Sequence, residues 1–77
     1  MTQIKVGVIG GAGYTAGELL RILVHHPAVE IVFVNSSSNA GNPVVDVHSG
    51  LIGETDLVFT SELPFGEVEA LFLCSAH

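Results

Sequence analysis

The chain has 77 residues, which is enough for at most one small domain. Its composition is 48% hydrophobic and only 13% charged, and the formal net charge is −6 with Lys5 and Arg21 as the only strong bases. This charge balance argues against binding to nucleic acid or to an anionic membrane surface. The single cysteine excludes an internal disulfide, and the absence of a signal-peptide pattern or a membrane-length apolar run leads us to expect a cytoplasmic protein.

The first predicted element is a buried-type strand from Ile4 to Ile9, rich in β-branched residues. Three glycines follow within four residues: Gly10, Gly11 and Gly13. Leu19 with Leu23 then shows helical spacing. The succession of strand, glycine turn and helix is typical of the phosphate-binding opening of a dinucleotide fold.

The glycine spacing fits two versions of that motif. Gly11-x-Gly13-x-x-Ala16 matches G-x-G-x-x-G/A, and Gly10-x-x-Gly13-x-x-Ala16 matches the shifted form. Glycine permits positive φ, which we expect at Gly13, and lets a pyrophosphate lie against the main chain. The predicted pyrophosphate site comprises Gly10, Gly11, Gly13, Tyr14, Thr15 and Ala16. An ordinary tight turn is the alternative interpretation.

Capping signals set the expected limits of the helix. Thr15 and Glu18 fit a capping box, which places the helix start between Tyr14 and Ala16. His25-His26-Pro27 predicts its end. Adjacent histidines point in different directions on a helix, so we assign the pair a helix-end role and predict no metal site.

A second strand is predicted from Val29 to Val34, parallel to the first. The small polar run Asn35 to Asn42 leaves its carboxyl end, where open α/β sheets bind ligands. A flexible linker is the alternative for this run.

The sequence after Asn42 predicts several short secondary-structure elements. We expect a helical turn in Pro43 to Leu51, a strand in Asp56 to Ser61, a turn or short helix in Pro64 to Val68, and a buried strand in Ala70 to Cys74. Asp46 and His48 suggest acid–base chemistry, but without a nucleophile beside them loop hydrogen bonds are the preferred interpretation. Cys74 is predicted to be a buried structural thiol. The fold class is therefore α/β, a Rossmann-like, mostly parallel sheet.

Three stretches resemble N-acetyl-gamma-glutamyl-phosphate reductase. Residues 10–19, G-G-A-G-Y-T-A-G-E-L, are similar to the family's G-A-S-G-Y-T-G-x-E-L, and residues 38–48 are similar to its A-G-K-P-V-S-D-V-H segment. The end of the chain resembles a strand that finishes in P-H-G, with Ala76 in the place of the proline before His77.

The resemblance implies an oxidoreductase of arginine biosynthesis. Such an enzyme reduces an acyl phosphate with NADPH to N-acetyl-glutamate semialdehyde and releases phosphate, through a thioester on a cysteine that lies beyond position 77. Residues 1–77 are then the N-terminal part of the dinucleotide-binding domain, with no catalytic residue and no metal ligand. The full-length protein is expected to act on a small molecule and to form a homo-oligomer. The alternatives are another semialdehyde dehydrogenase, such as aspartate-semialdehyde dehydrogenase, and a non-catalytic NAD(P)-sensing module.

The cofactor prediction depends on the loop after the second strand. NAD enzymes commonly place an acid there for the ribose hydroxyls, but no carboxylate occurs between Asn35 and Val45. Where the family has Ser-Arg, this chain has Ser36-Ser37. We therefore expect NADP, with its 2′-phosphate held by Ser36, Ser37 and Ser38 without an arginine.

Overall fold

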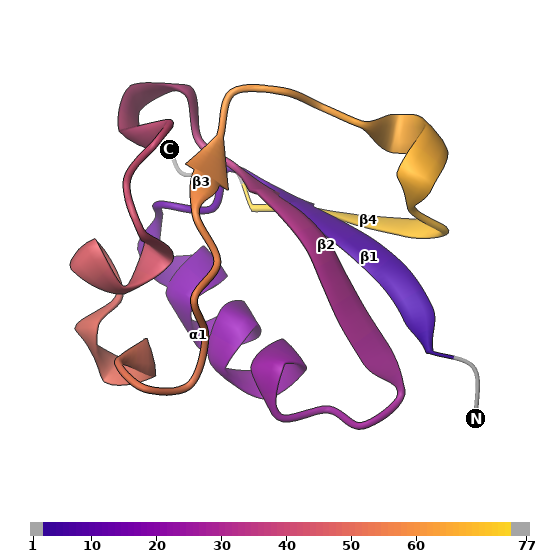
Figure 1. Cartoon of the computed structure of the whole chain (residues 1–77), viewed down its shortest axis with the longest axis horizontal. Coiled ribbons are helices and arrows are strands. Elements are labelled where there is room, and N and C mark those ends of the chain that lie inside the picture. The colour runs from indigo at the N-terminus through magenta and orange to yellow at the C-terminus, as the bar shows by residue number, and fades with distance from the viewer. Residues whose placement is uncertain (1–2, 75–77) are drawn as a thin grey trace.

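The computed structural model describes residues 3–74 as an α/β unit (Figure 1). Its strands are β1 (Ile4–Ile9), β2 (Val29–Asn35), β3 (Phe59–Thr60) and β4 (Ala70–Leu73). Its α-helix is α1 (Tyr14–Val24), and four 3₁₀ turns complete it: η1 (Ser37–Asn39), η2 (Val44–Asp46), η3 (Ser49–Leu51) and η4 (Phe65–Glu67). No helix in this part of the chain is long and apolar enough to cross a bilayer.

The four strands form one parallel sheet in the order β3-β2-β1-β4. Ile9 is in register with Asn35, and Asn35 with Thr60, so the carboxyl ends of β1, β2 and β3 lie side by side. The strand order reverses at β1, because β2 and β3 lie on one side of it and β4 on the other. This reversal is the position at which doubly wound sheets bind their ligands.

The core lies between the sheet and α1. Ala16, Leu20 and Leu23 recur at helical spacing and are the buried residues of α1. They pack with Val6, Val8, Val34 and Phe59 of the strands in one cluster. Figure 1 shows α1 and the turn-rich segment between β2 and β3 beside one another, and buried Val44 and Leu51 anchor that segment in the same core.

The other face of the sheet is apolar as well. Phe33 packs across Gly7, and a Cβ on Gly7 would lie only 2.2 Å from its ring. Leu71 and Leu73 alternate with the core-facing residues of β4 and are 42% and 73% exposed. The sheet therefore has apolar side chains on both faces, as strands of parallel sheets do.

The structure confirms most of the predicted elements and corrects two. The strand predicted in Asp56 to Ser61 is only the two-residue β3, and Val58 instead forms an isolated antiparallel bridge with Pro43. The last strand ends at Leu73, although the N–H of Cys74 still donates to the carbonyl of Ile9 at 2.9 Å. The prediction for Ser75, Ala76 and His77 lies outside the described residues.

Candidate dinucleotide site

The glycine loop connects the carboxyl end of β1 to the start of α1. Gly10 has a φ of +78°, whereas Gly13 has a φ of −77° and a ψ of 166°. The prediction of positive φ at Gly13 is therefore wrong, because the tight turn is made three residues earlier. Gly11 is required for another reason: a Cβ there would lie 2.2 Å from Cγ1 of Val34.

The predicted capping box is also wrong. The helix begins at Tyr14 with Gly13 as its N-cap, and no side chain caps it within residues 3–74. Thr15 is therefore already inside the first turn, and Glu18 pairs with Arg21 at 2.9 Å instead of turning back to the main chain. The first-turn N–H groups have no intrahelical acceptor, and no acidic residue occupies that turn. An anion fits this helix start by hydrogen bonding and by the helix dipole.

The remaining loop residues contribute differently. Tyr14 is 84% exposed and Thr15 is also exposed, so both side chains lie at the surface beside the loop. Ala16 is 0% exposed, which leaves only its N–H for a ligand. A small residue at position 16 instead allows α1 to approach the sheet closely.

The Ser36–Ser38 segment lies next to the glycine loop, because the N–H of Gly11 donates to the carbonyl of Asn35 at 2.8 Å. Ser36 is 7% exposed and is tied to the end of β3 through its N–H, which donates to Thr60 at 3.0 Å. Ser37 and Ser38 are exposed. The structure thus brings all the predicted cofactor-binding residues to one edge of the sheet.

His48 has a contact that its place in the sequence does not reveal. Its Nε2 atom is 2.7 Å from the carbonyl oxygen of Gly11, 37 positions earlier in the chain. The preferred interpretation of loop hydrogen bonding is therefore confirmed for His48, but its partner is the glycine loop and not Asp46. Its proximity to Asp46 in the sequence and the similarity of residues 38–48 to a family segment both marked this residue, but neither pointed to Gly11.

The paired histidines, His25 and His26, form contacts at the carboxyl end of α1. His25 is the C-cap and lies 2.9 Å from Glu54, while Nδ1 of His26 accepts from the N–H of Ala28 at 3.1 Å. These contacts confirm the helix-end role. Residues 3–74 contain no group of three or more potential metal-ligating side chains.

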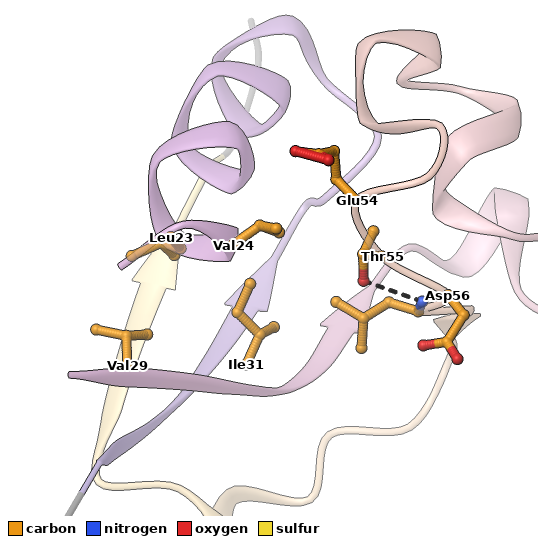
Figure 2. Close-up of a pocket in the computed structure, with 8 residues that line it drawn as sticks. Leu23, Val24, Val29, Ile31, Glu54, Thr55 and Asp56 are labelled. Atoms are coloured by element: carbon orange, nitrogen blue, oxygen red, sulfur yellow. Dashed lines mark hydrogen bonds between the residues drawn. The ribbon is translucent and has the colours of Figure 1, made fainter. Parts of the chain in front are cut away.

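Two other features have no assigned role in the site. Cys74 is buried, and burial raises the pKa of its thiol above the usual value. A surface hollow of about 230 Å³ lies at the far end of α1, where Leu23 and Val24 face Val29 and Ile31 (Figure 2). It is bordered by Glu54 to Leu57 and is remote from the glycine loop in the fold.

A parallel sheet whose strand order reverses at β1, with a glycine turn and an uncapped helix start at its carboxyl edge, defines the Rossmann-like class of dinucleotide-binding domains. The chain belongs to the semialdehyde dehydrogenase NAD-binding domain family, which it matches over residues 5–77.

Similar proteins include enzymes and a solved structure. N-acetyl-gamma-glutamyl-phosphate reductases of Phocaeicola vulgatus and Parabacteroides distasonis are 69% and 68% identical to the chain over 75 residues, which are 97% of this chain and 23% of theirs. The crystal structure of aspartate semialdehyde dehydrogenase with NADP from Candida albicans has a TM-score of 0.81 and 27% identity, over 97% of this chain and 24% of that one. The chain thus spans about a quarter of the length of the curated relatives.

Proposed function

We propose that residues 1–77 are the N-terminal part of the NADP-binding domain of an N-acetyl-gamma-glutamyl-phosphate reductase. The supporting observation is the identity of 69% with a reductase of that name over 75 residues. That length necessarily includes both the glycine loop and the segment up to His48. The geometry at the carboxyl edge of the sheet is compatible with the dinucleotide that such an enzyme needs.

Each part of the edge has an assigned role in this proposal. Backbone N–H groups between Gly10 and Ala16 hold the pyrophosphate, and Ser36, Ser37 and Ser38 hold the 2′-phosphate of the ribose. When bound, NADPH supplies the hydride that reduces the acyl group. The cysteine that carries the acyl group is expected in a catalytic domain outside residues 1–77.

The reaction that we propose for the whole enzyme is the reduction of an acyl phosphate. An acyl phosphate receives a hydride and a proton, loses inorganic phosphate, and becomes an aldehyde in the arginine biosynthetic route. The proposed enzyme is a cytoplasmic homo-oligomer that acts on a small molecule and binds neither nucleic acid nor membranes. The net charge of −6 is consistent with the last point.

Aspartate-semialdehyde dehydrogenase is the second candidate, because a structure of that enzyme shares the fold at a TM-score of 0.81. Its identity of 27% is far below the 69% of the reductase relative. A non-catalytic NAD(P) sensor is the third candidate, and no specific observation favours it.

One assay separates the three functions. The full-length protein is supplied with NADPH and either N-acetyl-γ-glutamyl phosphate or β-aspartyl phosphate, and NADPH oxidation is followed. We expect turnover with the first substrate. Turnover only with the second would identify the aspartate enzyme, and cofactor binding without turnover on either would indicate a sensor.

A further inference from the structure

His48 lies where the turn-rich segment, α1 and the glycine loop meet. Its Nε2 atom is 2.7 Å from the carbonyl oxygen of Gly11, and because a carbonyl only accepts, Nε2 carries the hydrogen and donates it. The backbone on either side of His48 is anchored by Val44, which is 0% exposed, and Leu51, which is 2% exposed. The imidazole is therefore a supported donor and not a freely rotating surface group.

The ring is enclosed on two further sides. A Cβ on Gly17 would lie 2.6 Å from Nδ1, so the helix presents bare backbone to the imidazole. The ring of Phe59 lies edge-on, with the two centroids 6.3 Å apart and an interplanar angle of 63°. Gly17 and Phe59 therefore flank the imidazole on two sides, while a surface hollow of about 180 Å³ borders it on another.

Both polar backbone groups of Gly11 are consequently fixed. Its N–H donates to Asn35 at 2.8 Å, and its carbonyl accepts from His48 at 2.7 Å. In a trans peptide the carbonyl and the following N–H point in opposite directions, so the N–H of Ala12 points away from His48. No carbonyl within residues 3–74 accepts a hydrogen bond from that N–H.

We propose that His48 is a positioning residue for the dinucleotide. By donating to the carbonyl of Gly11, it holds the peptide between Gly11 and Ala12 in the orientation that directs the Ala12 N–H to the pyrophosphate. The inference rests on the proposed function, because it requires that the glycine loop binds a dinucleotide. It assigns a role to a side chain that is not itself expected to touch the ligand.

The first test compares His48→Ala with His48→Gln in the full-length enzyme. NADPH is titrated by its fluorescence to obtain Kd, and KM and kcat are measured separately. We expect His48→Ala to raise Kd and the KM for NADPH about tenfold, the effect of one lost hydrogen bond, with kcat at saturating NADPH unchanged. His48→Gln retains an N–H donor at comparable reach and should restore Kd to within about threefold of the wild type.

The second test uses Gly17→Ala. Alanine normally stabilises a helix interior relative to glycine, but here its Cβ would displace the imidazole. We expect Gly17→Ala to raise the Kd for NADPH in the wild type and to have no such effect in the His48→Ala background. Gly50→Ala is the matched control, because a Cβ on Gly50 meets open space.

The outcomes separate this inference from the proposed function. A wild-type enzyme that does not bind NADPH would overturn both. If the wild-type enzyme binds NADPH, and either His48→Ala or Gly17→Ala binds it with the wild-type Kd, the role of His48 is overturned and the proposed function stands. Equal weakening by His48→Ala and His48→Gln would also overturn that role, because the donor would not be the cause. If His48→Ala does not fold, the Kd values of His48→Gln and Gly17→Ala decide the question.

Discussion

Gly10, Gly11 and Gly13 occupy three different backbone environments. Only Gly10 needs a conformation that other residues avoid, with its φ of +78°. Gly11 is limited by the side chain of Val34, and Gly13 has an extended conformation that any residue adopts. A substitution at each position therefore tests a different physical requirement of the loop.

Gly13→Val isolates the effect of filling the loop. Since the backbone at position 13 accepts a β-branched residue, we expect the variant to fold, with stability lower by about 1 kcal/mol because valine is a poorer N-cap than glycine. Its Cβ and methyl groups would occupy the place proposed for the pyrophosphate, so NADPH binding should become undetectable. Fluorescence titration of the full-length enzyme measures this, with Gly66→Val as the control because position 66 opens onto free space. Unchanged affinity in Gly13→Val would exclude the phosphate-loop assignment.

The cofactor preference is a second residue-scale prediction. Ser37 is exposed in η1, and no acidic residue between Asn35 and Val45 opposes a 2′-phosphate. We expect the wild-type enzyme to prefer NADP over NAD. Ser37→Arg should strengthen that preference by about 1 to 3 kcal/mol, roughly 5- to 150-fold in the ratio of kcat/KM values, through a charge-assisted hydrogen bond.

Two outcomes of the Ser37→Arg experiment would contradict the prediction. Ser37→Gln serves as a control of similar reach that lacks the positive charge. A wild-type enzyme that prefers NAD, or an arginine variant with no gain for NADP over the glutamine variant, would remove Ser36–Ser38 from the proposed 2′-phosphate site.

At the scale of elements, local pattern was sufficient for β1, α1, β2 and β4, whose apolar residues recur with the period of a strand or helix. The helix start at Tyr14 lies within the predicted range, but the predicted cap is wrong, because Thr15 and Glu18 satisfy a capping pattern that the glycine turn overrides. The sequence also predicts that the glycine loop and Ser36–Ser38 lie together, because the carboxyl ends of parallel strands meet at the same edge of a sheet. It could not reveal the contact of His48 with Gly11, which depends on how the turns η2 and η3 pack.

Gly7 provides the element-scale prediction, because it lies within β1 where a larger residue would ordinarily favour the strand. A Cβ on Gly7 would be 2.2 Å from the ring of Phe33, next to a register irregularity between Val6 and Gly7. We expect Gly7→Ala to destabilise the enzyme by about 1 to 3 kcal/mol through overpacking. Thermal unfolding of the full-length protein measures this, and Gly7→Ala combined with Phe33→Leu should recover part of the loss. Equal melting temperatures for Gly7→Ala and Gly66→Ala would contradict the close packing.

At the scale of the whole molecule, the main feature is a sheet that, within residues 3–74, α1 and the turns cover on one face only. The other face carries Leu71 and Leu73, which are exposed, and both edge strands are short. The curated relatives are much longer, since the matched region is 23% of their length. We therefore expect the remainder of a full-length chain to cover this face.

Leu73→Glu tests that expectation in two contexts. In an isolated 77-residue chain Leu73 is 73% exposed, so a glutamate should leave the hydrogen-exchange protection of that chain unchanged. In the full-length enzyme the same substitution should bury a carboxylate and lower the melting temperature markedly. The isolated chain itself should show little protection from hydrogen exchange and weak or absent NADPH binding by calorimetry, because apolar side chains of one sheet face, including Leu71 and Leu73, are exposed. Two results would contradict this expectation: a 77-residue chain that folds cooperatively and binds NADPH with micromolar affinity, or a full-length enzyme whose melting temperature is unchanged by Leu73→Glu. Either would show that residues 3–74 do not need the rest of the chain to cover the exposed sheet face.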